Sequence, residues 1–336
     1  MRPLRALGRA AFYVLVYPFV SFLAYHGLTL FAGYVSCVRN RVRVEDRDAL
    51  GRAIREGKGS GRPLFLVVNH LSMVDDPILP MAAIRSARRF LVTGGIAVAL
   101  LAAAIAASAT GRGPARWLWI AAVLWPAFLG VWGERKCWWS IGDFSNFAST
   151  QALRANLARH RREPFPLPLR AVLAFLDAFL PWFMTGPITK SILVPRERRE
   201  SAEAWKRERA RVHAETMRAL ATGEAVLFFL EGTRSRDPEV IGPPKRGTGD
   251  ALVEVLRAGL RPRVFVIYHR GLEEIVPIGG RKWFNGGRTI DVLVEELAPD
   301  RYQEAARQPD GAERIVNDLH ARLVAMQARW RATRKT

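Results

Sequence analysis

The stretch LFLVVNHLSMVDDP, residues 64–77, predicts a buried strand that leads directly into a polar turn. Its first five residues are all apolar, as in strands covered on both faces of a sheet. His70 then lies on the turn, and Asp75 comes five residues later. If Asp75 begins the next helix, its carboxylate can accept the proton of one imidazole nitrogen of His70 and leave the other nitrogen free as a base. This arrangement needs no protein nucleophile, because a hydroxyl of the substrate can attack.

A second polar motif follows another apolar run, AVLFFL at 225–230. Its members are Glu231, Gly232, Thr233 and Arg234. The glycine lets a ligand approach the backbone, the threonine offers a hydroxyl, and Arg234 can hold a phosphate through two parallel hydrogen bonds. Glu231 either binds the substrate that carries the attacking hydroxyl or holds Arg234. Lys245 opens a further basic, glycine-rich turn. Because α/β folds place their sites at the carboxyl ends of strands, these turns and His70 predict an anion-binding site.

The rest of the chain alternates short apolar runs with helical patterns, which indicates an α/β fold. Further strands are expected at 192–194, 264–268 and 290–294. A charged helix is expected from Ser201 to about Leu220, with Ser201 as its cap and Gly223 as its stop. Another helix is expected after Asp310.

The composition combines a strong positive charge with high hydrophobicity. Lys and Arg exceed Asp and Glu by 20, the chain is 49% hydrophobic, and it contains ten Trp. Charge alone would suit nucleic acid or an anionic membrane face. The aromatic residues gather in apolar runs, so we expect an anionic membrane surface as the partner and no nucleic acid. Cys37 and Cys137 indicate neither a disulfide framework nor a thiolate metal site, which fits a catalytic domain on the cytoplasmic face, at the inner membrane in a bacterium.

Three apolar segments predict attachment to that membrane. Residues 10–38 follow a basic leader, are too long for a signal peptide and are interrupted by Pro18 and His26, so they predict a retained anchor that spans or re-enters the bilayer. The runs 90–107 and 117–132 flank the turn GRGPAR and predict a helical hairpin in the membrane. Two buried helices of a soluble core are the alternative for this pair.

Both polar motifs resemble those of a known family. NHLSMVD, at 69–75, is similar to the first block of the glycerolipid acyltransferases, and FLEGTRSR to their third block, with Leu230 where the family usually has proline. ILVPRERRESAEAW resembles the second block mainly through Arg196 and lacks its customary glycine. The resemblance implies the glycerophospholipid acyltransferase fold, a mixed sheet flanked by helices, with catalytic roles for His70 and Asp75. The substrate contacts that it implies are Glu231, Gly232, Thr233, Arg234, Arg196 and Lys245.

A narrower resemblance is to the tafazzins, which remodel phospholipids. It is carried by the run Asp75-Asp76-Pro77 and by the segment 268–294, in which His269 belongs to a tafazzin-like pattern. We nevertheless interpret His269 as structural. A tafazzin-like enzyme takes its acyl chain from another phospholipid, whereas a lysophosphatidic acid acyltransferase takes it from acyl-CoA or acyl carrier protein. Both forms transfer a fatty acyl group to a lysophospholipid hydroxyl, and a degenerate member of the family would only bind lipid.

The expected organisation follows from these segments. A membrane anchor is expected at 1–45 and an acyltransferase domain at 60–300, into which the hairpin is inserted at about 90–132. The remaining residues, 301–336, are expected to form a C-terminal helix. The chemistry requires no metal ion and no cofactor beyond the acyl donor, and we find no cluster of metal-ligating residues in the sequence.

Overall fold

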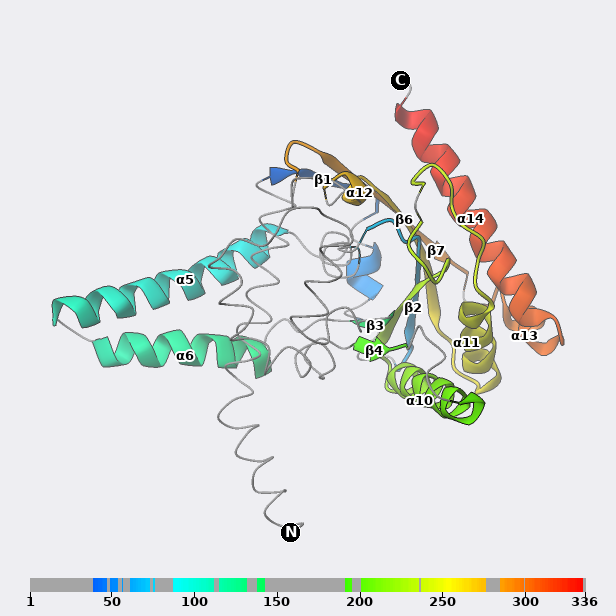
Figure 1. Cartoon of the computed structure of the whole chain (residues 1–336), viewed down its shortest axis with the longest axis horizontal. Helices are drawn as coiled ribbons and strands as arrows, with labels where there is room; N and C mark the ends of the chain where they lie inside the picture. The colour runs from blue at the N-terminus through cyan, green and yellow to red at the C-terminus, as the bar shows by residue number, and fades with distance from the viewer. Residues whose placement is uncertain are drawn as a thin grey trace, which may run out of the picture.

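The chain forms a mixed α/β sheet with flanking helices (Figure 1). The computed structural model describes residues 39–46, 49–53, 56, 61–72, 75, 87–111, 115–131, 138–142, 191–194, 201–235, 237–275, 285–298 and 300–334. Within these ranges the strands are β1 (Arg41–Val44), β2 (Leu64–Val68), β3 (Trp138–Gly142), β4 (Ser191–Leu193), β5 (Ala225–Phe229), β6 (Arg263–Arg270) and β7 (Thr289–Leu297). They form one seven-stranded sheet in the order β1-β7-β6-β2-β5-β3-β4. The predicted α/β fold is therefore confirmed.

Strand β2 is central to the sheet and runs parallel to both of its neighbours. Val68, its last residue, is level with Phe229 of β5 on one side and with Ile267 of β6 on the other. All five residues of β2 are buried, as its apolar sequence predicts. The sheet is mixed because β7 pairs antiparallel with β6, whereas the other pairs are parallel. The register of the parallel strands β2, β5 and β6 brings their carboxyl ends together at one edge of the sheet.

Helices α10 (Ala202–Ala221), α11 (Arg246–Arg257) and α14 (Gly311–Arg334) pack beside the sheet (Figure 1). The two short helices α12 (Leu272–Ile275) and α13 (Gln303–Arg307) lie on the connections around them. Ser201 caps α10 as predicted, because its hydroxyl accepts the N–H of Ala204 at 3.1 Å. Gly223 follows the helix with a φ of 75°, the left-handed conformation expected of a glycine stop.

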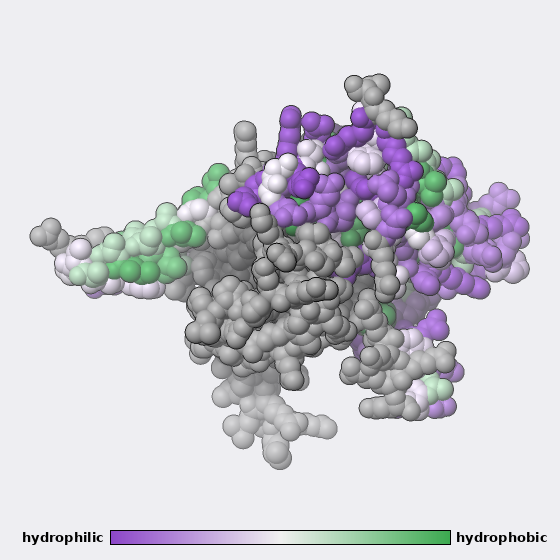
Figure 2. All heavy atoms as spheres, turned by 45° about the horizontal axis from the view of Figure 1, so that its top comes forward, coloured by the Kyte–Doolittle hydropathy of each residue, from purple (hydrophilic) through white to green (hydrophobic). Residues whose placement is uncertain are grey.

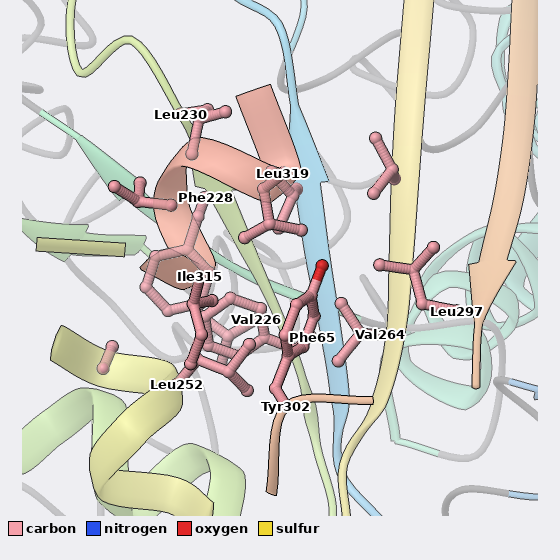
Figure 3. Close-up of a cluster of buried hydrophobic side chains, with 14 of the residues drawn as sticks. Phe65, Val226, Phe228, Leu230, Leu252, Val264, Leu297, Tyr302, Ile315 and Leu319 are labelled. Atoms are coloured by element: carbon pink, nitrogen blue, oxygen red, sulfur yellow. The ribbon is translucent and has the colours of Figure 1, made fainter. Parts of the chain in front are cut away.

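The main core lies between the sheet and these helices (Figure 3). Alternate strand residues face it: Phe65 of β2 stacks on Phe228 of β5, with ring centroids 4.2 Å apart. Leu252 of α11 and Leu319 of α14 approach the same rings from the helix layer (Figure 3). The last helix buries one side of its length against the sheet, through Ile315, Leu319, Leu323 and Met326. This packing fixes the strands whose ends carry the polar motifs.

The predicted hairpin is present as α5 (Ala87–Thr110) and α6 (Ala115–Val131), which lie side by side and project away from the sheet (Figure 1). Figure 2 shows apolar side chains gathered on this arm. Of the eleven large hydrophobic side chains exposed in the described residues, nine lie on it. They are Val92, Ile96, Val98, Leu101, Ile105, Trp117, Trp119, Ile120 and Leu124.

The part of the chain that the structure describes contains no helix that is both long and apolar enough to cross a membrane. Helix α6 has 17 residues and is about 26 Å long, less than the roughly 30 Å of a hydrocarbon core. The two helices of the predicted hairpin are present, and their predicted place in a membrane stays a prediction. The predicted anchor at 10–38 lies outside the described residues.

Candidate active site

The two polar motifs meet where the parallel strands end. His70 lies two residues beyond β2, and Glu231 lies two residues beyond β5. His269 is the penultimate residue of β6, on the other side of β2. Because β2 pairs with both β5 and β6, these three side chains arrive at the same edge of the sheet. The structure therefore joins segments that are far apart in the sequence.

The imidazole of His70 contacts the carboxylate of Asp75. The His70 Nδ1 atom lies 3.0 Å from Asp75 Oδ2. The same oxygen accepts the backbone N–H groups of Leu71 at 2.7 Å and Ser72 at 2.8 Å. These two donors hold the carboxylate within the turn. Because Asp75 is fully buried while the side chain of His70 is 23% exposed, the second ring nitrogen, Nε2, is the one left for a substrate.

The surroundings of Asp75 favour its ionised form. Burial opposes that charge, but the charge of His269 and its hydrogen bond, followed by those of His70, outweigh burial and hold the pKa of Asp75 well below its ordinary value. An ionised carboxylate accepts protons and donates none. Asp75 therefore requires a proton on Nδ1 of His70 and so selects the tautomer in which Nε2 can act as a base.

The EGTR turn holds the backbone of His70 from both sides. The N–H of His70 donates to Glu231 Oε2 at 2.8 Å, and the N–H of Ser235 donates to the carbonyl oxygen of His70, also at 2.8 Å. The other oxygen of Glu231 accepts the N–H of Gly242 at 2.5 Å. The His70 ring stacks on Phe229, with centroids 4.1 Å apart. The Glu231 carboxylate thus links His70 to the loop that follows β5.

Gly232 and Lys245 lie against each other in this loop. Gly232 has a φ of 64°, and a Cβ at this position would lie 2.7 Å from Lys245 Cγ. The Lys245 N–H donates to the carbonyl oxygen of Leu230 at 2.8 Å, which fixes its backbone beside the motif. Thr233 is exposed, and Arg234 is half-buried. The structure therefore groups these residues close to His70, whereas Arg196 lies outside the described residues.

Sequence reasoning missed one residue of this site, His269. It is fully buried, and its Nε2 atom lies 3.4 Å from Asp75 Oδ2. Its sequence signal was its place at the end of an apolar run, the same place that His70 has after β2. That signal becomes informative only when β6 is known to pair with β2. The sequence interpretation of His269 as structural did not include this contact.

Comparison with known proteins adds a family match. The family model described as "Acyltransferase" matches residues 153–276, a range that includes the EGTR motif and Lys245. His70 and Asp75 precede the matched range, and the fold joins them to it. The search of curated proteins found no matching sequence.

One solved structure found by comparison is 1-acyl-sn-glycerophosphate (LPA) acyltransferase, PlsC, from Thermotoga maritima. It is 14% identical, the alignment covers 96% of this chain and 97% of that one, and the TM-score is 0.37. A likeness at this TM-score is too distant to support a conclusion.

Proposed function

We propose that this chain, an acyltransferase whose residues 153–276 match the family model of that name, transfers a fatty acyl group to a lysophospholipid hydroxyl, with His70 as the base. The observation that carries the proposal is the 3.0 Å contact between His70 Nδ1 and Asp75 Oδ2 beside the EGTR motif. This contact directs one ring nitrogen to a buried carboxylate and leaves the other for the acceptor. A positioned base of this kind contributes roughly 10²- to 10⁴-fold to the rate.

The proposed reaction balances without a covalent enzyme intermediate. His70 Nε2 takes the proton of the acceptor hydroxyl as its oxygen attacks the acyl carbonyl, and a tetrahedral intermediate forms. When this intermediate collapses, the bond from the carbonyl carbon to the donor's sulfur or oxygen breaks, and His70 returns the proton to that leaving atom. Asp75 holds the imidazole in place and stabilises its positive charge between the two transfers.

The basic groups beside His70 suit the phosphate of the acceptor. Lys245 packs over Gly232, and Arg234 follows in the same turn. We propose that Arg234 and Lys245, with Arg196, bind the headgroup phosphate and so place the hydroxyl near His70. Thr233 adds a hydroxyl donor. The backbone hydrogen bonds that hold Glu231 support a role for it in shaping this site, along with its proposed contact to the acceptor.

Two forms of the reaction differ in the acyl donor. Phospholipid remodelling of the tafazzin type uses a second phospholipid, and it is supported by Asp75-Asp76-Pro77 and by the segment that contains His269. Acylation of a 1-acylglycerol 3-phosphate uses acyl-CoA or acyl carrier protein, and it is supported by the EGTR form of the third motif. Both forms use the same base and the same phosphate-binding residues, so the donor must be found by experiment.

We propose that the enzyme works at an anionic membrane surface, with its catalytic domain on the cytoplasmic face. The exposed apolar side chains of α5 and α6 support this, because a projecting arm of this composition is stabilised by contact with lipid. Trp117 and Trp119 are exposed near the start of α6, and the guanidinium of Arg116 lies 5.4 Å from the Trp117 ring centroid. Tryptophan and arginine are typical of the boundary between headgroups and acyl chains.

The test is an assay in vesicles that contain the purified full chain and a labelled lysophospholipid. Acyl-CoA, acyl carrier protein loaded with a fatty acid, or intact phospholipid is supplied as the sole donor. We expect acylation with one donor class and its loss in His70→Ala, while His213→Ala, a change at an exposed histidine, keeps the activity. Full activity in His70→Ala would overturn the role of His70 as the base. No transfer by the wild type from any donor would leave lipid binding as its function.

A further inference from the structure

The second histidine of the site, His269, is joined to Asn69 by three hydrogen bonds. The N–H of His269 donates to Asn69 Oδ1 at 2.9 Å, and Asn69 Nδ2 donates to the carbonyl oxygen of His269 at 3.0 Å. The third bond joins His269 Nε2 to the carbonyl oxygen of Asn69 at 3.0 Å. All of these atoms are buried. The bonds fix the end of β6 against the turn that carries His70.

These bonds also determine which nitrogen of His269 carries a proton. A carbonyl oxygen can only accept a hydrogen bond, so Nε2 must be the donor to Asn69. The same Nε2 lies 3.4 Å from Asp75 Oδ2, and both side chains are fully buried. The Nε2 N–H of His269 is therefore directed at the Asn69 carbonyl, and its nitrogen lies within ion-pair distance of the oxygen that also contacts His70 Nδ1. Asp75 Oδ2 lies between two imidazoles.

The contacts of Asp75 are one-sided. Its described partners, the two imidazoles and the backbone N–H groups of Leu71 and Ser72, all converge on Oδ2. Its Oδ1 atom is buried and has no hydrogen-bond partner among the described residues. The orientation of the Asp75 carboxylate therefore depends on the groups that contact Oδ2. Of these partners, His269 is the one that belongs to a strand, β6, so its charge can hold the carboxylate relative to the sheet.

We propose that His269 is a positioning residue that holds the carboxylate of Asp75 in line with His70. This inference rests on the proposed function, in which His70 is the base. His269 acts through Asp75 and touches neither the acceptor nor the donor. Its loss leaves the substrate-binding loop intact, because Glu231, Gly232 and Lys245 make their contacts without it. The expected defect therefore lies in kcat, with little change in KM.

The charges around His269 agree with this role. Burial opposes a positive charge on its ring, but Asp75 outweighs burial and raises the pKa of His269, with a further contribution from Glu273 of α12. Glu231 faces the same group from the loop after β5. His269 is in turn the largest favourable influence that lowers the pKa of Asp75, ahead of His70. Without His269, the contacts of His70 would oppose the effect of burial on the pKa of Asp75.

The test compares three variants of the full chain in the vesicle assay, each checked for folding by thermal unfolding. His269→Leu removes the donor, and His269→Gln keeps an amide N–H near the position of Nε2. Val266→Ala is the matched control, because it destabilises the same strand at a fully buried site without touching Asp75. We expect His269→Leu to lower kcat by roughly tenfold to a hundredfold with KM within about twofold of the wild type. His269→Gln should recover part of the loss, and Val266→Ala should keep its kcat.

The pH profile separates positioning from a general loss of stability. In His269→Leu the acidic limb of the kcat profile should move to higher pH, since Asp75 then takes up a proton more readily. The inference is overturned if folded His269→Leu has the kcat and pH profile of the wild type, or if its defects equal those of Val266→Ala. Failure of the proposed function would be seen separately, as full activity in His70→Ala.

Discussion

The backbone N–H of His70 donates to Glu231 Oε2 at 2.8 Å, across 161 residues of sequence. The other carboxylate oxygen of Glu231 accepts the N–H of Gly242 at 2.5 Å. Burial raises the pKa of Glu231, and these two backbone donors act against that rise. Both oxygens of Glu231 face N–H groups. The surroundings of this position therefore stabilise a carboxylate better than a neutral side chain of similar size.

Replacing Glu231 with glutamine should therefore destabilise the protein and impair catalysis. The amide nitrogen of glutamine must face one of the two backbone N–H groups, so a hydrogen bond to a charged group is lost. We expect the free energy of unfolding to fall by about 1.5–3 kcal/mol. Thermal unfolding and the vesicle assay measure the two effects. Glu254→Gln, at an exposed pair with His213, is the control and should change neither. A Glu231→Gln protein as stable as the wild type would contradict the role of these bonds.

Gly232 offers a test of the packing between the EGTR turn and Lys245. Gly232→Ala places a Cβ 2.7 Å from Lys245 Cγ and requires alanine at a φ of 64°. Gly61→Ala is a matched control, since Gly61 has the same φ and no atom of the described residues lies within 4 Å of the added Cβ. Each variant should lose roughly 1–2 kcal/mol of stability from the left-handed backbone. We expect the KM for the lysophospholipid to rise in Gly232→Ala alone. An equal rise in both variants would remove Lys245 from the binding site.

The ion pair of His269 and Asp75 predicts a pH-dependent stability. Because the pKa of His269 is raised in the folded protein, its contribution is complete below the ordinary value of 6.5 and is lost as pH rises through the folded value. Because the pKa of Asp75 is lowered, its contribution is present above its ordinary value of 3.8 and is lost as pH falls through the folded value. The melting temperature of the wild type should exceed that of His269→Leu most between these limits, at about pH 5.5.

The same difference should shrink as the pH rises through the folded pKa of His269, which lies above its ordinary value of 6.5, and differential scanning fluorimetry over this range measures it. Val266→Ala removes no titrating group, so its deficit in melting temperature should stay constant with pH. If the deficit of His269→Leu were constant as well, its contact with Asp75 would not be an ion pair.

The arm formed by α5 and α6 should determine binding to lipid vesicles. Replacing Trp117 and Leu124 with serine removes two of its most exposed apolar side chains, which are 59% and 58% exposed. Since burial of one such side chain contributes roughly 1.5–3 kcal/mol, we expect the partition coefficient into anionic vesicles to fall at least tenfold. Val240→Ser and Val324→Ser, at exposed positions outside the arm, should have little effect. Equal binding by all of these variants would assign membrane contact to another part of the chain.

The sequence predicted the elements that have a strong apolar pattern. The buried strands β2, β5, β6 and β7 and the helices α10 and α14 were found within a few residues of their bounds. The strands β1, with the alternating sequence RVRV, and β3, with WWSIG, were missed because they are short and lack a continuous apolar run. The helices α5 and α6 were predicted from their continuous apolar composition, which does not determine whether they enter a membrane.

The site was predicted only as far as local spacing allows. His70 and Asp75 lie five residues apart, so a turn is enough to bring them together. The contacts of His70 with Glu231, and of Asp75 with His269, depend on β2 lying between β5 and β6, and strand order cannot be read from a single sequence. His269 looked like an ordinary buried histidine for this reason.

The central place of β2 has a consequence for the order in which the molecule is made. Both neighbours of β2 come later in the chain than α5 and α6, so a nascent chain displays the arm well before the catalytic edge can close. Such non-local parallel pairing is slow to form. We expect ribosome-bound chains that end near residue 200 to bind vesicles without transferring acyl groups, a separation that flotation and activity measurements can detect. The nascent chain would therefore attach to lipid before it can become catalytically active.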